Sequence, residues 1–378
     1  MKKHPHKFSS LLYALILGTI LLFASNTTAG QNLNFSSAID LSSSASANCY
    51  IVSNAGLYKF KTVKGNSAEP SGNATSASIL WESFGTSVTP NVGDLIKSVA
   101  YKEGYIAFQT AEVFKEGNAL IAAKNAEGTV LWSWHIWLTD LPEGQVYYNN
   151  AGTMMDRNLG ATSATPGDVG ALGLMYQWGR KEPFMGSSSI SSSIVAESTI
   201  IWPNSVKSDE IYGTIEYATA NPTTFIVYNS NNYDWYYTGD NSSDNTRWTE
   251  SCSPKSIYDP CPSGWRVPDG GSNGVWAKAL GSDSYVEDYP FDVKNKGIDF
   301  SGRFGSAATI WYPSSGCRYI NDCGLNLVGN FGNYWSASPR DNYFNKHYMS
   351  FYNAGYVDPS NYNLCASFLS VRCIKAED

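Results

Sequence analysis

The sequence predicts a two-domain, β-rich protein: an N-terminal all-β antiparallel sandwich followed by a C-terminal α+β domain. The first observation is a series of about seven short strand-like segments between residues 49 and 139, separated by Gly, Asn and Pro. The second is the break at 141–144, Leu-Pro-Glu-Gly, after which short strand-like segments are mixed with helix candidates. The third is the length, because 378 residues are enough for two domains. We place the sandwich at 31–144 and the second domain at 145–378.

The sandwich strands are predicted from alternation of apolar and polar residues. Tyr58, Phe60 and Thr62 alternate with Lys59 and Lys61, a period of two that places the apolar side chains on one face. Frequent turn signals over roughly 100 residues are typical of an antiparallel sandwich. The expected strands are 49–53, 57–63, 79–84, 96–101, 105–109, 119–123 and 129–139.

Tryptophan and tyrosine are abundant, with 12 Trp and 25 Tyr, while charged residues make up only 16% of the chain. This composition suits a secreted β-rich protein with a recognition surface, because both side chains combine a large apolar body with a polar end. We interpret Trp132, Trp134 and Trp137 as core residues of the last sandwich strand rather than as a binding strip.

The N-terminus has the features of a signal peptide, which we place at 1–30. Three lysines precede an apolar run, Leu11 to Ala24, that is short for a membrane span, and Ala29 is a candidate cleavage position. A retained signal anchor is the alternative. No cysteine directly follows the apolar run, so we expect no lipoprotein anchor there.

The charge balance argues against a nucleic-acid partner. Residues 1–30 contain three lysines and no acid, so their removal leaves 23 of the 26 basic residues against 33 acidic ones, a net charge of −10. No basic patch of the kind that binds nucleic acid is visible in this composition.

Seven cysteines in an exported chain predict disulfides. Six of them follow residue 250, and six cysteines allow 15 pairings among which the sequence does not choose. Cys49 is left over, either as a free buried thiol or as an intermolecular partner. The disulfide candidates are Cys252, Cys261, Cys317, Cys323, Cys365 and Cys373.

The C-terminal domain is less regular. Helical spacing predicts a helix over 171–180 and a short one over 274–279. Asp259 to Pro268 holds three prolines, a cysteine and a tryptophan, which indicates a rigid, crosslinked corner. Further strands are expected at 154–159, 300–304, 309–312, 332–336, 348–351 and 366–373.

A long polar and aromatic stretch, 200–255, is the candidate recognition region. Aromatic faces stack on sugars or peptide side chains, and the neighbouring amides and hydroxyls would orient such a ligand. Core packing of the same aromatic residues is the alternative. The predicted ligand-binding residues are Trp235, Tyr236, Tyr237 and Trp248.

Catalytic signals are weak. Without the leader only His135 and His347 remain as histidines, and no zinc, nucleophile-elbow or phosphate-binding motif is present. Acidic loops at 240–244 and 283–288 could hold calcium, but they lack EF-hand spacing and are better interpreted as solvated loops. We therefore predict no catalytic residue, no metal ligand and no cofactor.

Five ordered motifs between residues 150 and 375 resemble the Fibrobacter succinogenes major paralogous (FISUMP) domain. They are MDRNLGA at 155–161, LMYQWGRKEPF at 174–184, CPSGWRVP at 261–268, YWSAS at 334–338 and VRC at 371–373. The residues within them that match the family and that we expect to be structural are Asp156, Arg157, Asn158, Trp178, Gly264, Trp265, Arg266, Trp335 and Arg372.

The resemblance implies a C-type lectin-like fold for the C-terminal domain and a place on the surface of Bacteroidetes. The region 49–60 also resembles, more loosely, the first domain of fimbrillin-like proteins. Together they imply a non-catalytic adhesin, such as a fimbrial tip or accessory subunit, that joins other subunits by β-strand addition and binds a glycan or protein on a cell surface.

Two departures from these families argue against a calcium-dependent sugar site and leave the lipoprotein route into a pilus unsupported. Trp202-Pro203-Asn204 and Tyr334-Trp335-Ser336 lack the acidic and amide residues of calcium-dependent sugar sites, and the lipobox common among such subunits is missing. The alternatives are a free-standing carbohydrate-binding protein and an enzyme of the formylglycine-generating type. The latter shares the broad fold and would need a reactive cysteine pair in an open cleft.

Overall fold

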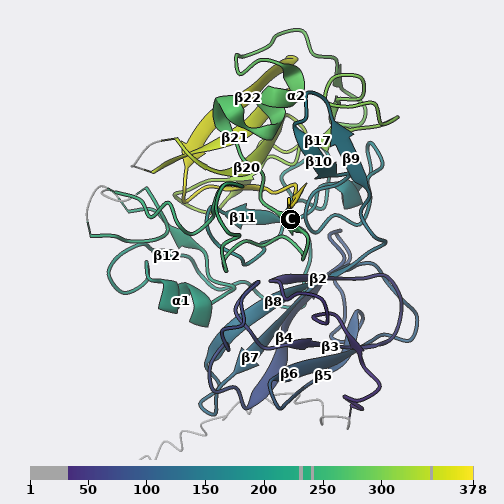
Figure 1. The fold of residues 1–378 in the computed structure, drawn as a ribbon, viewed down its shortest axis with the longest axis vertical. Helices are drawn as coiled ribbons and strands as arrows, with labels where there is room; N and C mark the ends of the chain where they lie inside the picture. Colours follow the sequence, from purple (N-terminus) through teal and green to yellow (C-terminus); the bar gives the residue numbers. More distant parts are fainter. Residues whose placement is uncertain (1–32, 230–232, 240–241, 341–343, 378) are drawn as a thin grey trace, which may run out of the picture.

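The computed structural model describes residues 33–229, 233–239, 242–340 and 344–377, so the predicted signal peptide lies outside the described residues. The described chain is mostly β-sheet, as predicted (Figure 1). It contains two short α-helices, α1 (Ile215–Ala220) and α2 (Val275–Leu280). Among these residues no helix is long and apolar enough to cross a membrane.

Two four-stranded sheets form the N-terminal part. One has the order β1-β3-β6-β5 and the other β2-β8-β7-β4, and their pairs are antiparallel except β1–β3 and β2–β8. Their facing side chains share one apolar core, in which Phe60 and Trp134 meet with ring centroids 5.2 Å apart. Every predicted strand of this part is present. The bounds are β1 Ile39–Asp40, β2 Cys49–Val52, β3 Leu57–Lys61, β4 Ser76–Ser83, β5 Ile96–Lys102, β6 Tyr105–Thr110, β7 Gly117–Lys124 and β8 Val130–Leu138.

Strand β8 is buried on both faces. Trp134 and Ile136 point into the core between the two sheets. Trp137, of opposite parity, belongs to a second core that it shares with C-terminal residues, and its indole N–H donates to the Ala161 carbonyl at 2.9 Å. The C-terminal part therefore lies against the outer face of the β2-β8-β7-β4 sheet (Figure 1). All three tryptophans of β8 are at most 2% exposed, as expected of core residues.

The C-terminal part contains many short strands. Its main sheet has the order β19-β18-β23-β20-β21-β22, with β11 joined to β23, and a four-stranded sheet has the order β14-β24-β10-β9. The main-sheet bounds are β11 Met175–Gln177, β18 Cys317–Arg318, β19 Leu325–Asn326, β20 Phe331–Pro339, β21 Asn345–Tyr352, β22 Tyr356–Leu364 and β23 Phe368–Ser370. The others are β9 Gly144–Tyr147, β10 Gly152–Met155, β12 Val206–Lys207, β13 Ile226–Val227, β14 Trp265–Arg266, β15 Phe291–Asp292, β16 Gly297–Asp299, β17 Trp311–Pro313 and β24 Ile374–Lys375.

The predicted helix over 171–180 is wrong. A 3₁₀ turn, Val169–Ala171, ends at its start, and β11 occupies its middle. Gly173 and Gly179 have φ of +72° and +79°, so the two glycines that the helical spacing tolerates turn the backbone into the left-handed region instead. The short helix predicted at 274–279 is present as α2.

Two predicted strands differ from the structure. The strand expected at 154–159 ends at Met155, where β10 ends. No strand covers 300–304; the Phe304 N–H donates to the Phe300 carbonyl at 2.9 Å, which makes this segment a turn. The apolar residues of the two segments, Met154, Met155, Leu159, Phe300 and Phe304, are buried in the core, and burial alone does not require a strand.

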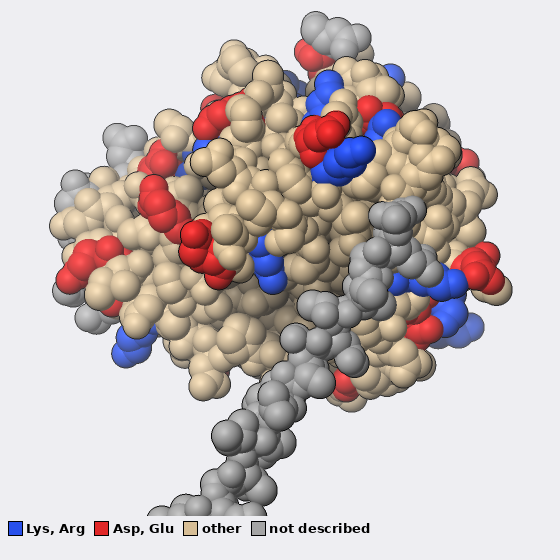
Figure 2. Space-filling model, turned by 90° about the horizontal axis from the view of Figure 1, so that it is seen from below, with Lys and Arg blue, Asp and Glu red and all other residues tan. Residues whose placement is uncertain are grey.

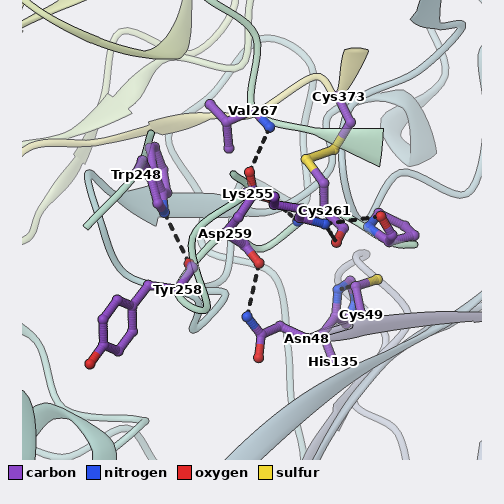
Figure 3. Close-up of a disulfide and its surroundings, with 11 residues drawn as sticks. Asn48, Cys49, His135, Trp248, Lys255, Tyr258, Asp259, Cys261, Val267 and Cys373 are labelled. Carbon is purple, nitrogen blue, oxygen red and sulfur yellow. Dashed lines mark hydrogen bonds and ion pairs between the residues drawn. A yellow bond between two sulfur atoms is a disulfide. The ribbon is translucent and has the colours of Figure 1, made fainter. Parts of the chain in front are cut away.

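The corner at 259–268 is crosslinked, as predicted. Cys261 forms a disulfide with Cys373, 112 residues away, and β14 pairs with β24 beside it. The Asp259 carboxylate accepts the N–H groups of Cys261 and Val267 at 2.8 and 2.9 Å, which closes the turn between them. Asn48, from the N-terminal part, donates to the Asp259 carbonyl (Figure 3), so the corner also fastens the two parts together.

The prediction of several disulfides is wrong in number. Of the six candidates only Cys261 and Cys373 are bonded, while Cys252 is free and exposed. Cys317, Cys323 and Cys365 are free and buried, and so is Cys49. Burial raises the pKa of the thiols of Cys317, Cys323 and Cys365 to about 12, so these side chains act as small apolar core residues.

Four of the five motifs place a buried arginine in the core. Arg157, Arg180, Arg266 and Arg372 are between 1% and 6% exposed. Arg372 donates to Asn158 and to the Trp311 carbonyl, and Arg266 donates to carbonyls of 249, 250 and 253. The remaining motif residues are buried or half-buried except Ser263 and Gly264, which are exposed, and Gly264 has φ +76° in an open turn.

Candidate recognition site

The aromatic residues predicted to bind a ligand divide into two groups. Trp235 and Trp248 are 1% and 0% exposed, and their indole N–H groups donate to the carbonyls of Trp178 and Tyr258. Arg247 lies over the Trp235 ring, 4.7 Å from its centroid. These two tryptophans are core residues and present no free face to a ligand.

Tyr236 and Tyr237 are half-buried and lie beside the buried Trp235. The Tyr237 N–H donates to the Gly213 carbonyl, which ties this segment to the loop before α1. Only these two of the four predicted residues can offer ring surface to a ligand. Residues 240 and 241 of the nearby acidic loop lie outside the described residues.

His135 lies at the interface between β8 and the C-terminal part, which we call the joint. Its contacts are those of a residue that stabilises the fold rather than of a catalytic base. Its Nδ1 is 3.3 Å from the Cys49 Sγ, and its Nε2 is 2.8 Å from the Asn118 Oδ1. The Asn118 amide nitrogen in turn donates to the Gly160 carbonyl across the joint. Burial lowers the pKa of His135 to about 3 and raises the pKa of the Cys49 thiol, so both side chains are neutral at pH 7.

Among the described residues, neither charged side chains nor metal-ligating side chains mark a ligand site. No group of three or more His, Cys, Asp or Glu side chains there is placed to hold a metal ion. On the face drawn in Figure 2 basic and acidic side chains are interspersed across a mostly uncharged surface. This face therefore shows no large patch of one charge.

The clearest candidate for a ligand site is a cleft of about 470 Å³ on the main C-terminal sheet. Strands β18, β20 and β21, together with the turn after β18, contribute its lining. Its volume lies in the range of sites that bind small molecules. The lining residues that matter for recognition are Tyr228, Tyr319, Phe331, Asn333, Tyr348 and Asn363.

One wall of the cleft is the end of an aromatic ladder. Phe331 stacks on Tyr352 across the β20–β21 pair, with ring centroids 5.4 Å apart. Tyr352 stacks on Tyr356 at 4.5 Å, and Tyr356 on Tyr285 at 5.0 Å. Because Tyr352 covers one face of Phe331 and Phe331 also lines the cleft, the ladder holds this ring in place before any ligand arrives.

The other aromatic walls are supported in the same way. Tyr228 stacks on Tyr233, with centroids 5.4 Å apart and planes 8° apart. Tyr348 packs edge-on against the buried Trp335 at 6.0 Å. Tyr319 differs, since it projects from the turn after β18 and is 41% exposed. The cleft thus combines fixed rings with one open ring at its rim.

Two amides supply complementary polar groups. Asn333 is 5% exposed; its amide nitrogen donates to the Gly316 carbonyl, and its Oδ1 accepts no bond from the described part of the chain. The Asn363 Oδ1 accepts from the Leu364 N–H and the Ser367 hydroxyl, and its amide nitrogen has no bonded partner among the described residues. These two amides therefore present one free acceptor and one free donor to the cleft.

The described residues that line the cleft include no acidic side chain, and Arg318 is the one charged residue among them. That guanidinium is already engaged, because it donates to the carbonyls of Met185 and Cys323. A ligand therefore meets rings, amides and hydroxyls rather than a free ion-pairing group.

The sequence contained a signal for this cleft that alternation could have exposed. Phe331 and Asn333 on β20 share a parity, and so do Tyr348 and Tyr352 on β21, as expected of residues on one sheet face. Tyr228 and Tyr319 could not be assigned in this way, because they reach the cleft from loops far apart in the sequence.

Comparison with known proteins supplies no relative. No family model matches the chain, and neither a curated protein nor a solved structure matches it. The resemblance to the FISUMP domain therefore rests on the five motifs.

Proposed function

We propose that the protein is an exported, non-catalytic adhesin of the cell surface, a fimbrial tip or accessory subunit. The observation that carries the proposal is the cleft on the main C-terminal sheet, whose aromatic walls are fixed by second rings before a ligand binds. The signal-peptide features of 1–30 and the five FISUMP-like motifs support an exported surface protein.

The joint between the two parts favours a rigid subunit. One apolar core includes Trp81 and Trp137 from the N-terminal sheets together with Trp178 and Trp335 from the C-terminal part. Lys181 is 4% exposed and donates to the Ser133 carbonyl and hydroxyl across the joint. A pull on a ligand held in the C-terminal cleft would pass to the N-terminal sheets without a flexible linker.

Assembly by β-strand addition requires an uncovered sheet edge in the N-terminal part. The β4 edge is covered, because Thr199 N–H donates to the Glu82 carbonyl and Glu197 N–H to the Thr86 carbonyl. Strand β5 lies at the edge of the other sheet, and among the described segments only β6 makes main-chain hydrogen bonds to it. We infer that β5 is one edge that could receive a partner strand.

A free-standing carbohydrate-binding protein is the second candidate, and the same cleft supports it. The formylglycine-generating alternative gains no support from the cysteines. Cys261 and Cys373 are both fully buried, and the one thiol that lines the cleft, Cys317, has its pKa raised by burial to about 12.

The location of the protein tests the proposal. Sheared fimbriae from a strain that produces the chain should cosediment with it, and deletion of its gene should lower adherence while leaving fimbriae in place. If the protein stays in the supernatant of a fimbriated strain, the fimbrial role is lost and the free-standing alternative is favoured. Retention inside the cell would overturn both.

A further inference from the structure

We propose that the cleft between Phe331, Tyr228 and Tyr319 binds one sugar residue of a glycan, without calcium. This inference rests on the proposed function and specifies the ligand class of its binding site.

The ring surfaces of the cleft suit the apolar face of a sugar. A pyranose presents C–H groups on one face, and these pack on aromatic rings as apolar groups do. Phe331 and Tyr228 each have one face covered by another ring, Tyr352 and Tyr233, so ligand binding costs less side-chain entropy than it would with unsupported rings. Tyr319, open at the rim, would cover the bound ring from solvent.

The polar groups suit the hydroxyls of the same ligand. A sugar hydroxyl both donates and accepts, and the cleft offers an acceptor, the Asn333 Oδ1, and a donor, the Asn363 amide nitrogen. The Asn333 side chain is 5% exposed, and its Oδ1, which accepts no bond from the described part of the chain, is available to a ligand hydroxyl. An aliphatic peptide side chain could fill the volume but would leave this oxygen without a partner.

Charge narrows the ligand class further. Among the described residues that line the cleft there is no carboxylate, which leaves a cationic ligand without a counter-ion and calcium without the hard oxygen ligands it requires. The Arg318 guanidinium already donates to the carbonyls of Met185 and Cys323, so it offers no free ion-pairing group to a ligand. A neutral sugar is therefore the best match, with binding that is insensitive to calcium chelation.

The test is binding of the full chain without its leader to a glycan array, in calcium and in EDTA, followed by titration of the strongest glycan. Two variants remove different features: Tyr319→Ala removes the rim ring, and Asn333→Leu removes the free Oδ1 acceptor at similar side-chain volume. Tyr362→Ala is the matched control, because Tyr362 is 46% exposed on β22 and does not line the cleft. Thermal melting of each variant verifies folding.

We expect equal binding with and without calcium, a loss of about tenfold in affinity for Tyr319→Ala and for Asn333→Leu, and no change for Tyr362→Ala. Binding that needs calcium, or that survives in a folded Tyr319→Ala protein, would overturn the site. Absence of any glycan ligand, with adherence still lost on gene deletion, would overturn the sugar assignment and leave the adhesin proposal standing. If Asn333→Leu does not fold, the affinity of the Tyr319→Ala protein alone tests the proposed site.

Discussion

The N-terminal and C-terminal parts of the molecule hold their chains together by different means. The N-terminal part consists of two four-stranded sheets around an apolar core, and it contains no arginine. The C-terminal part has many strands of only two or three residues, and it contains every arginine of the chain, from Arg157 onward. Six of these arginines are at most 6% exposed.

Backbone carbonyls explain the difference. A ladder of long strands satisfies its own carbonyls, whereas loops and short strands leave carbonyls that need other donors when they are buried. A guanidinium has five N–H groups in a fixed plane and can serve several carbonyls at once. Arg318 binds carbonyls of Met185 and Cys323, and Arg372 that of Trp311. In the C-terminal part, buried arginines such as these donate to backbone carbonyls that sheet ladders would satisfy in the N-terminal part.

The largest expected effect comes from the one covalent crosslink of the C-terminal part. Replacement of both Cys261 and Cys373 by alanine should lower the free energy of unfolding by about 4 kcal/mol, because the bond closes a loop of 112 residues in the unfolded chain. Urea unfolding followed by tryptophan fluorescence measures it.

Reduction provides the matched comparison. A reducing agent should bring the wild-type chain to the stability of the double variant and leave the variant itself unchanged. Cys252→Ala is the control, since Cys252 is free and exposed. Equal stability of oxidised and reduced wild type would mean that the arginine network alone holds the C-terminal part.

Arg372→Met tests that network directly. Methionine keeps the apolar stem but removes the donors to the Asn158 Oδ1 and the Trp311 carbonyl, so two buried acceptors lose a charged partner. We expect a loss of about 3 kcal/mol in the free energy of unfolding, measured by urea titration.

Two surface cations serve as controls for Arg372→Met. Arg303→Met in the C-terminal part and Lys61→Met on β3 replace exposed side chains and should each change stability by less than about 0.5 kcal/mol. An effect of Arg372→Met no larger than theirs would contradict the carbonyl-donor role of the buried arginines.

The difference between the regular strands of the N-terminal part and the short strands and loops of the C-terminal part also determines how much of the fold could be predicted from the sequence. Most strands of the N-terminal part alternate or form apolar runs, so seven of its eight strands, β2 to β8, were predictable, and β8 is apolar on both faces because both faces are buried. In the C-terminal part Gly173 and Gly179 imitate helical spacing while adopting positive φ. Strand β22 was missed because Pro359 and several asparagines interrupt its pattern.

The candidate site was harder to predict for a related reason. Trp235 and Trp248 lie in a polar, irregular stretch of the sequence, which is typical of a ligand site, but both side chains are buried in the core. The cleft draws on Tyr228, Tyr319 and Phe331 from separate elements, and nothing in their local pattern brings them together. Likewise, spacing among six cysteines could not select the pair Cys261–Cys373, because pairing depends on the fold.

The joint between the two parts should show the smallest of these effects, and it should depend on pH. His135 is fully buried, and its pKa is lowered from about 6.5 to about 3 because burial disfavours the charged ring. The unfolded chain therefore binds a proton below about pH 6.5 that the folded chain does not bind until about pH 3. The contribution of His135 to the free energy of unfolding is therefore fully present above about pH 6.5 and is lost as the pH falls below it.

Between pH 7 and pH 5 the loss should reach about 2 kcal/mol, at about 1.4 kcal/mol for each pH unit below the unfolded pKa. Urea unfolding at several pH values measures the slope. His135→Gln removes the titrating ring and keeps a polar side chain of similar reach beside Asn118, so its stability should fall less steeply with acid. Identical pH slopes for the variant and the wild type would show that His135 is not the acid-sensitive group, and that the joint resists acid as well as the apolar core between the N-terminal sheets.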